Sequence, residues 1–353
     1  MSSLCYFCPN CICPSSQRPV KRYKSILRGI FPKSPGEEPN EKKIGKLCGY
    51  ISKNPHRVEK ITKILDRKCY NALRNENFYI ASAVLCIYRR VLLSSREQMP
   101  RFADNLLNII QTLLDQTRND EMRILGCHTL FEFINSQVRA LGYKLRFTFK
   151  VQLNMTDGTH MVIIENFIPK LCDLALELGN ENRVCSLRCA GLQTLSSMVW
   201  FMGEHSHVSE EFDNVVSAIL ENHERQSKEA KDSADSTSTE YVRCPSVHKM
   251  ITLASSSLGA MSRIPSWNRI INKKGELNLT LEETKNPSFW SRVCINNMAK
   301  LAKEATTIRR VIDSIFRYFD HENLWSSQYG PSLSVLYDIQ VAMEKYGMDV
   351  FFL

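Results

Sequence analysis

Two stretches, LGCHTLFEF at residues 125–133 and LRCAGLQTL at residues 187–195, share the pattern L-x-C-x-x-L and decide the fold class. Each lies in a helical apolar pattern and carries small residues, Gly126 and Cys127 in the first and Ala190 and Gly191 in the second. Small side chains let neighbouring helices approach closely, as the inner helices of HEAT and armadillo repeats do. The similarity of the two stretches therefore favours stacked helical repeats. The alternative is an ordinary helical bundle in which the similarity arose by chance.

Apolar residues recur at helical spacing over most of the chain after residue 40. Short breaks, such as Asn54-Pro55 and Gly179-Asn180, separate the segments, so neighbouring helices are expected to pack antiparallel. We predict an all-α, HEAT/armadillo-like helical repeat solenoid. Its helices are expected at residues 41–52, 55–73, 77–95, 100–116, 120–137, 160–178, 182–203, 208–225, 288–304 and 306–319.

One stretch departs from the helical period. In YKLRFTFKVQLN, residues 143–154, apolar and polar side chains alternate, which is the period of a strand. A lone strand has no partner in a helical solenoid, so we interpret residues 138–154 as a strand-like insertion. An insertion also accounts for the wide spacing of the two echoed stretches, since a HEAT period is about 40 to 47 residues.

A second irregular region begins with QSKEAKDSADSTSTE at residues 226–240. This polar, Ser-rich composition buries too little apolar surface to offset the loss of chain entropy. The predicted organisation is therefore a main solenoid at residues 41–225 and a mostly disordered linker at 226–286. A further repeat at 287–325 and an atypical tail at 326–353 follow.

Residues 1–33 have a composition of their own. Four thiols among apolar residues are followed by six basic residues before the first acid. S-acylation, for example with palmitate, uses cysteines of this kind, and stable anchoring needs two signals, here acyl chains and a polybasic patch. We predict a membrane-anchoring segment. Its lipidation sites are Cys5, Cys8, Cys11 and Cys13, and its contacts with anionic lipid are Arg18, Lys21, Arg22, Lys24, Arg28 and Lys33.

The same four thiols leave a metal site and an unmodified tail as alternatives. The spacing C-x2-C-x2-C-x-C falls short of the cysteine run of bacterial ferredoxins. A structural zinc site usually separates its ligands by a folded element, whereas these thiols lie within nine positions. We therefore assign no metal ligand and no cofactor.

Residues 19–31 combine an apolar stripe with basic residues at helical spacing, which predicts a short amphipathic helix. The stripe includes Tyr23, Leu27, Ile30 and Phe31. It would lie in the membrane interface or dock on the following domain, and docking would hold the basic side outward.

Other features exclude function classes. No Gly-rich phosphate loop, Gly-x-Ser-x-Gly or His-Glu-x-x-His motif occurs, so we assign no catalytic residue. His205 and His207 lie among glutamates, but a His-x-His pair diverges on a helix, which disfavours a metal site. The absence of an eighteen-residue apolar run or an apolar signal core predicts a protein that is neither membrane-spanning nor secreted.

The net charge of +9 is concentrated at the start of the chain, which favours an acidic surface as the partner. The cysteines beyond the tip lie on apolar helical sides, typical of a reducing compartment. Those predicted to be small core residues are Cys86, Cys127, Cys172, Cys189 and Cys294.

Several stretches in order give the chain a family resemblance. They include RPVKRYKSILRGIFP at residues 18–32, VLCIYRRVLLSSREQMP at 84–100 and SFWSRVCINNMAKLAKEATTIRRV at 288–311. They resemble the rolling-blackout family of plasma-membrane armadillo-like proteins, in particular its plant SEMI-ROLLED LEAF-type branch, from Leu4 to about Trp325.

The resemblance implies a non-enzymatic rod of repeats on the cytoplasmic face of the plasma membrane, held by acylated cysteines and basic residues. It further implies a tetratricopeptide-type adaptor and a phosphatidylinositol 4-kinase as partners, without nucleic acid or a small-molecule substrate. The function implied is recruitment of a phosphatidylinositol 4-kinase complex through the adaptor. Because family members continue well beyond this length, membrane anchoring could survive here while kinase recruitment is lost or weakened.

Two other function classes fit parts of the sequence. A soluble HEAT-repeat adaptor of transport or nucleic-acid assemblies would use Arg and Lys along an inner groove. A small N-terminal metal- or cluster-binding protein would use the four thiols. Because the basic residues cluster at the N-terminus, the membrane scaffold is favoured.

Overall fold

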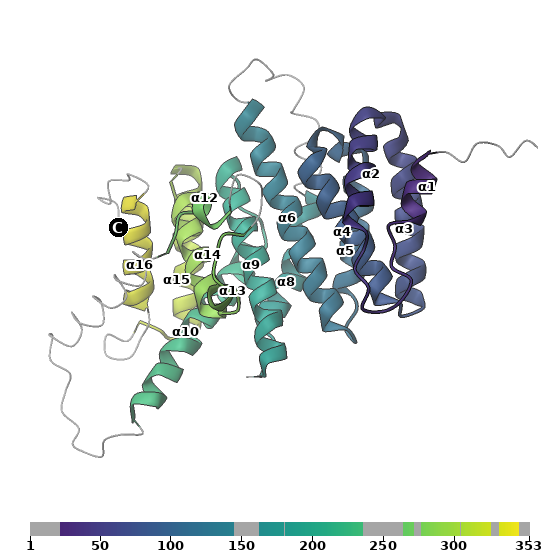
Figure 1. Cartoon of the computed structure of the whole chain (residues 1–353). Coiled ribbons are helices and arrows are strands. Elements are labelled where there is room, and N and C mark those ends of the chain that lie inside the picture. The colour runs from purple at the N-terminus through teal and green to yellow at the C-terminus, as the bar shows by residue number, and fades with distance from the viewer. Residues whose placement is uncertain are drawn as a thin grey trace, which may run out of the picture. The chain divides into compact units, whose positions relative to one another are not determined.

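The computed structural model describes residues 22–144, 162–179, 181–235, 264–271, 277–303, 305–325 and 332–345. These residues form helices joined by turns, with one isolated antiparallel bridge between Ile271 and Leu277. The fold is an all-α helical repeat, as predicted (Figure 1). The chain divides into two compact units, Met1–Phe102 and Ala103–Leu353.

The first unit is built around α4. Helix α1 packs on α2, and both α2 and α3 pack on α4, whose apolar residues are buried along most of its length. Asn40 caps α2 by accepting a hydrogen bond from the Lys43 amide at 3.0 Å. The elements are α1 (Arg22–Arg28), α2 (Glu41–Lys53), the 3-10 turn η1 (Pro55–Arg57), α3 (Val58–Arg74), α4 (Phe78–Ser94) and the 3-10 turn η2 (Arg96–Arg101).

The second unit is built around α9, which packs against α6, α8 and α14. Every residue of α9 from Leu187 to Met202 is buried, so this helix has no solvent-facing side over that length. The labelled elements are α5 (Ala103–Leu114), α6 (Asp120–Lys144), α8 (Ile168–Ala175), α9 (Asn182–His205), α10 (Phe212–Asp235), α12 (Trp267–Ile270), α13 (Leu281–Thr284), α14 (Pro287–Leu301), α15 (Ala305–His321) and α16 (Ser332–Lys345).

The small residues of the two echoed stretches lie where helices approach closely. A Cβ atom on Gly191 would lie 2.9 Å from the Leu171 carbonyl oxygen of α8. A Cβ atom on Gly126 would lie 3.2 Å from the Leu114 side chain of α5. The predicted role of these glycines in close packing is confirmed, and it is stricter at Gly191, where backbone atoms are the neighbours.

The helix bounds differ from the expected ones at several places. Helix α6 continues through Lys144, so the first two residues of the predicted strand are helical; residues 145–154 lie outside the described residues. Helix α10 continues to Asp235, ten residues into the expected linker, because Ala, Lys and Glu favour continuation of a helix whose first half is packed. The helix expected at 160–178 is interrupted: residues 162–165 are helical, a turn follows at 166–167, and α8 then begins with Pro169 in its first turn, where proline is tolerated.

The region expected to be an atypical tail contains α16, whose buried residues Val335, Ile339 and Ala342 recur at helical spacing. Helices α12 and α13 lie within the region expected to be a linker, while residues 236–263 and 272–276 of that region lie outside the described residues.

Candidate membrane-facing surface

Helix α1 is docked on the first unit through its apolar side. Tyr23, Leu27 and the following Ile30 are at most 4% exposed. The Tyr23 ring lies 6.2 Å from the Tyr50 ring of α2, and the Asn40 amide donates to the Ile30 carbonyl oxygen at 2.9 Å. The apolar stripe was expected either to lie in the membrane interface or to dock on the following domain, and these three residues dock on the domain.

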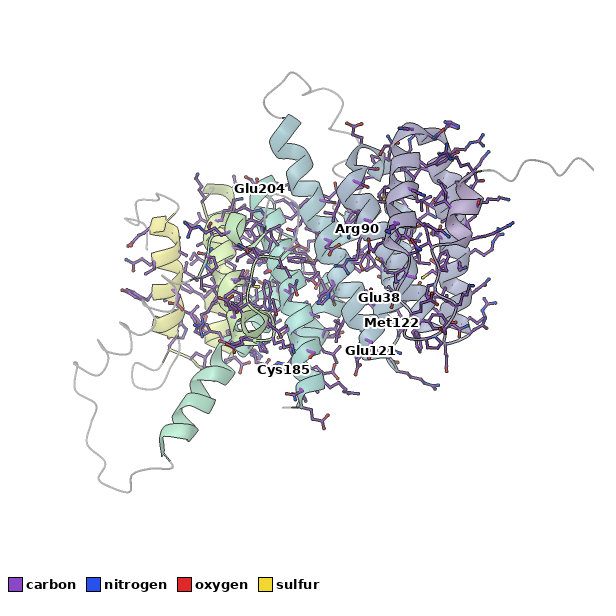
Figure 2. The ribbon with its side chains drawn as sticks, viewed as in Figure 1. Glu38, Arg90, Glu121, Met122, Cys185 and Glu204 are labelled. Carbon is purple, nitrogen blue, oxygen red and sulfur yellow. The ribbon has the colours of Figure 1, made fainter. Side chains whose placement is uncertain are left out.

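The basic residues of α1 consequently face solvent. Arg22, Lys24 and Arg28 are exposed, as is Lys33 beyond the helix. Figure 2 shows nitrogen-tipped side chains projecting from the purple helices of this unit. The remaining predicted site residues, Arg18, Lys21, Cys5, Cys8, Cys11 and Cys13, lie outside the described residues.

A cation–π contact fixes the segment that follows α1. The Lys68 ammonium of α3 lies 3.6 Å from the centroid of the Phe31 ring. Burial lowers the pKa of Lys68 from its ordinary value. This lysine therefore contributes to packing and is distinct from the exposed basic residues around it.

Sequence reasoning missed the basic residues that continue along α2 and α3. On α3 they are spaced at three-, four- and seven-residue steps, so they share one side of the helix. The exposed ones are Lys42, Lys43, Lys46 and Lys53 of α2, and Lys60, Lys63, Arg67 and Arg74 of α3.

Counting charge by unit would have revealed this excess. Residues 1–102 contain 20 Lys and Arg against 7 Asp and Glu, whereas residues 103–353 contain 26 against 30. Three of the seven acids are already engaged: Glu37 accepts a 2.9 Å hydrogen bond from the Lys33 amide, Glu41 pairs with Arg90 at 3.1 Å, and the buried Asp66 accepts a 2.6 Å hydrogen bond from Tyr88. The basic charge thus belongs to the whole first unit and not to its first residues alone.

The histidine cluster of the second unit is divided among separate partners. The His205 ring nitrogen Nδ1 lies 2.9 Å from the Phe201 carbonyl oxygen, whereas His207 Nε2 lies 2.8 Å from Glu165 Oε1. Glu204 pairs with Lys300 instead. Across the described part of the chain, no three His, Cys, Asp or Glu side chains gather as metal ligands would.

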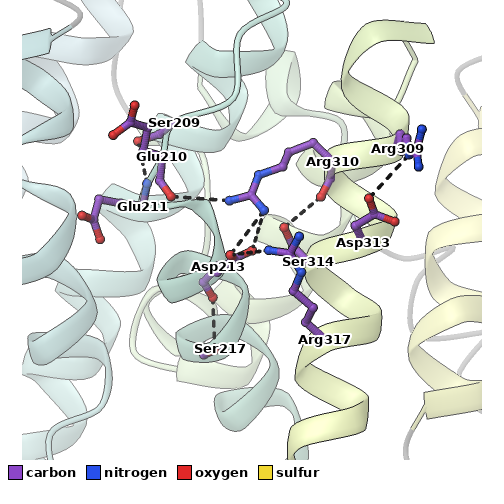
Figure 3. Close-up of polar contacts among 10 residues, drawn as sticks. All are labelled: Ser209, Glu210, Glu211, Asp213, Ser217, Arg309, Arg310, Asp313, Ser314 and Arg317. Carbon is purple, nitrogen blue, oxygen red and sulfur yellow. Dashed lines mark hydrogen bonds and ion pairs between the residues drawn. The ribbon is translucent and has the colours of Figure 1, made fainter.

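A second charged cluster joins α10 to α15 (Figure 3). Arg310 and Arg317 each lie 3.1 Å from a carboxylate oxygen of Asp213. Burial alone would raise the pKa of Asp213, but hydrogen bonds from Ser314 and Arg310 and the charges of Arg310 and Arg317 outweigh it and lower the pKa. The cluster ties the two helices together at the surface.

Most of the cysteines predicted to be core residues are buried: Cys127, Cys172, Cys189 and Cys294. Burial raises the pKa of Cys127 and of Cys172 to about 12. Cys86 differs from the prediction, since it is only half-buried and its thiol lies 3.9 Å from Glu41 Oε1. Cys185, at the start of α9, is also half-buried (Figure 2).

Among the helices in the described ranges, none combines the length and apolar character needed to cross a bilayer. In comparison with known proteins, the family model of the EFR3 armadillo repeat matches residues 44–349.

Individual relatives match over different lengths. The rice protein SEMI-ROLLED LEAF 2 is 35% identical over 354 residues, which cover 98% of this chain and 33% of the rice protein. Human EFR3 homolog A is 24% identical over 142 residues, 40% of this chain and 17% of its own length. A crystal structure of Efr3 covers 94% of this chain and 65% of its own, with 11% identity and a TM-score of 0.41. The chain thus spans about one third of the rice relative.

Proposed function

This chain belongs to the EFR3 armadillo-repeat family, and from that membership we propose that it is a non-enzymatic scaffold at the cytoplasmic face of the plasma membrane. Armadillo repeats are a scaffold-type fold, in which stacked helices present extended surfaces to partners. The first unit would bind the lipid surface, and the second unit would present its helices to other proteins.

The observation that carries the proposal is the outward display of Arg22, Lys24 and Arg28 by a helix whose apolar side is buried. Because Tyr23 and Leu27 are held in the core, the basic side chains start from a fixed backbone and face solvent. Each Lys or Arg near an anionic cytoplasmic leaflet contributes about 1 kcal/mol, and salt weakens this attraction.

Acylation of Cys5, Cys8, Cys11 and Cys13 supplies the second anchoring signal in this proposal. A single acyl chain gives only marginal, reversible binding, so acyl chains and basic residues together account for stable attachment. The thiols lie nine or more residues before α1, within reach of a surface that the helix contacts.

The partners belong to the same proposal. A tetratricopeptide-type adaptor and a phosphatidylinositol 4-kinase are implied by the resemblance in sequence. The chain spans about a third of the rice relative, so co-precipitation with each partner has to be measured separately from membrane binding.

A soluble adaptor of nucleic-acid assemblies is the second candidate, because the exposed basic residues run from α1 onto α2 and α3. Such an adaptor would neutralise phosphates with these residues and bind duplexes with a steep salt dependence. The membrane scaffold is preferred because both the four thiols and the basic helix would then serve membrane attachment.

The test is sedimentation of the full, unacylated chain with phosphatidylcholine vesicles with and without phosphatidylserine. Changing Arg22, Lys24 and Arg28 to Gln should weaken binding to the anionic vesicles roughly a hundredfold at low salt, from about 1 kcal/mol per charge. The matched control changes the exposed Lys285, Lys303 and Arg309 of the second unit to Gln and should alter binding less than twofold.

Equal losses in the two triple variants would show that α1 is not the lipid contact. Duplex DNA that binds the chain more tightly than the anionic vesicles would favour the second candidate. In cells, the full chain should pellet with membranes and carry thioester-linked lipid, whereas the variant with all four N-terminal cysteines changed to Ser should do neither.

A further inference from the structure

The loop between α1 and α2 carries the sequence KSPGEE at residues 33–38. All six residues are exposed, and the stretch ends at Glu38 (Figure 2). The two ends of the loop are held together, since the Asn40 amide donates to the carbonyl oxygen of the buried Ile30 at 2.9 Å. The stretch therefore lies in solvent between two fixed points.

A tight turn carries Ser34 at its first position. The Glu37 amide donates to the Ser34 carbonyl oxygen at 3.3 Å, and Pro35 and Gly36 lie between them. Gly36 has a φ of 91°, and proline followed by a residue with positive φ is the pattern of a type II turn. Apart from its chain neighbours, a Cβ atom on Gly36 would meet nothing within 4 Å among the described residues, so the space around the turn is open.

The backbone of this stretch is bonded only to the stretch itself, as far as the described residues show. The Glu37 amide donates to Ser34, and the Lys33 amide donates to the Glu37 side chain at 2.9 Å. A protein kinase binds its substrate as a short extended segment, so these two bonds open while α1 and α2 stay folded. Exposed loops on a rigid scaffold are where such sites are usually found.

The residue after Ser34 narrows the class of kinase. Ser34-Pro35 is the only Ser-Pro or Thr-Pro pair in the sequence. Proline-directed protein kinases select proline at this position, because proline has no backbone N–H that the kinase would leave without an acceptor. The chain thus offers such a kinase a single site, and that site is exposed.

We propose that Ser34 is a phosphorylation site for a proline-directed kinase, and that its phosphate weakens the attachment of the first unit to an anionic membrane. The kinase transfers the γ-phosphoryl group of ATP to the Ser34 hydroxyl oxygen. A bond from phosphorus to that oxygen forms, the bond to the β,γ-bridging oxygen of ATP breaks, and ADP and the hydroxyl proton leave. The effect on attachment rests on the proposed function of α1.

The phosphate would lie beside a predicted lipid contact. Ser34 directly follows Lys33, so their Cα atoms are about 3.8 Å apart. Residues 33–38 contain one Lys and two Glu, a formal charge of −1, and a phosphate of about −1.5 to −2 brings this to about −3. Because phosphate and anionic lipid repel each other, the modification opposes the attraction of the basic residues.

The first experiment treats the full chain with ATP and a recombinant mitogen-activated protein kinase, which is proline-directed. Peptide mass spectrometry should find phosphate on Ser34 of the folded chain. The Ser34→Ala and Pro35→Ala chains should carry none in this loop.

A synthetic peptide of residues 28–40 is the matched substrate. If the peptide is phosphorylated on Ser34 and the folded chain is not, the fold hides the serine and the proposal is overturned. If neither is phosphorylated, the sequence is no site for this class of kinase, which overturns it as well.

The second experiment sediments the chain with phosphatidylcholine vesicles that contain phosphatidylserine. The phosphorylated chain should bind about tenfold more weakly than the unmodified chain at low salt, and the difference should shrink as salt rises. Ser34→Glu, which adds one charge, should weaken binding about fivefold. Ser186→Glu, at an exposed position of α9 in the second unit, is the control and should alter binding less than twofold.

Full phosphorylation of Ser34 that leaves vesicle binding unchanged, in a chain whose unmodified form binds, overturns the regulatory role. Equal losses in the Ser34→Glu and Ser186→Glu chains do the same, since the effect would then be one of net charge. A chain that binds anionic vesicles in neither form overturns the proposed function of α1 together with the regulatory role. Mass spectrometry decides independently of this result whether Ser34 is phosphorylated.

Discussion

The Thr194 hydroxyl of α9 donates a hydrogen bond to the Cys127 carbonyl oxygen of α6, 3.1 Å away, and both residues are fully buried. The same hydroxyl lies 2.8 Å from the Ala190 carbonyl oxygen within its own helix. The bond therefore joins the two helices that carry the similar stretches: Cys127 is the cysteine of the shared pattern in α6, and Thr194 lies two residues after the last leucine of the pattern in α9.

Replacing Thr194 by Val should lower the free energy of unfolding of the second unit by about 1 kcal/mol, because the bond between the helices is lost while the volume is kept. Thr112→Val in α5 is the control, since the Thr112 hydroxyl donates to the Asn108 carbonyl oxygen of its own helix, at 2.9 Å. The chain's four tryptophans all lie in the second unit, so urea unfolding followed by their fluorescence reports on it. Equal effects of the two changes would contradict a role for the inter-helix bond.

Gly191→Ala should destabilise the second unit by about 1–3 kcal/mol, because the new Cβ atom would meet the backbone of α8 at 2.9 Å. Gly203→Ala in the same helix is the control: its nearest neighbour, the Leu301 amide nitrogen, is 3.5 Å away. That change should be neutral or stabilising by up to about 1 kcal/mol through helix propensity. Thermal unfolding of both variants measures the difference, and a tolerated Gly191→Ala would mean that α8 can move.

Asp213→Asn should reduce stability at pH 7, by no more than about 1 kcal/mol because the pair is partly exposed. The lowered pKa of Asp213 means that its contribution is present above the unfolded pKa, about 3.9, and is lost as the pH falls through the folded value. The difference between the two chains should hold from pH 7 to about 5 and shrink below about 4. Asp313→Asn, which removes a partner 3.8 Å from the exposed Arg309, should change little at any pH.

Alkylation by iodoacetamide at pH 8 should modify the half-buried Cys185 well before Cys69, Cys127 and Cys172. Burial raises the pKa of each of these three thiols to about 12, which leaves roughly one in ten thousand ionised at that pH. Peptide mass spectrometry measures each site separately. In urea all four should react at similar rates, and native labelling of Cys127 as fast as Cys185 would contradict its burial.

The helices of the repeats could be predicted because their signal is local. Helix α2, expected at 41–52 and found at Glu41–Lys53, has an apolar stripe, an Asn cap and a proline after its end within a short window. The role of Gly191 could also be predicted, since a glycine costs stability inside a helix and is usually kept there for close packing.

The packing of Trp267 against Phe131 and Trp200 could not be predicted because its signal is not local. Trp267 stands in a polar region, and its partners Phe131 and Trp200 lie more than sixty residues before it. The extension of α10 was missed for a related reason: the sequence beyond Arg225 is strongly polar, and only the packed first half of the helix supports its continuation.

The basic residues of α2 and α3 were missed because the net charge of +9 was assigned to the start of the chain. Only the fold shows that Lys60, Lys63 and Arg67 belong to the same compact unit as α1. The role of the four N-terminal thiols stays a prediction, since these residues lie outside the described part of the chain.

The complete burial of α9 affects how the chain folds while it is being synthesised. The helices α6 and α8, which pack on α9, precede it in the chain. Helix α14, which also packs on it, begins only at Pro287, 82 residues after α9 ends at His205. At about 5–20 residues per second, a ribosome needs roughly 4 to 16 s to make that stretch. Throughout that interval the nascent chain carries an apolar helix without its last neighbour, so this family member is expected to depend on chaperones that bind nascent chains until α14 has emerged.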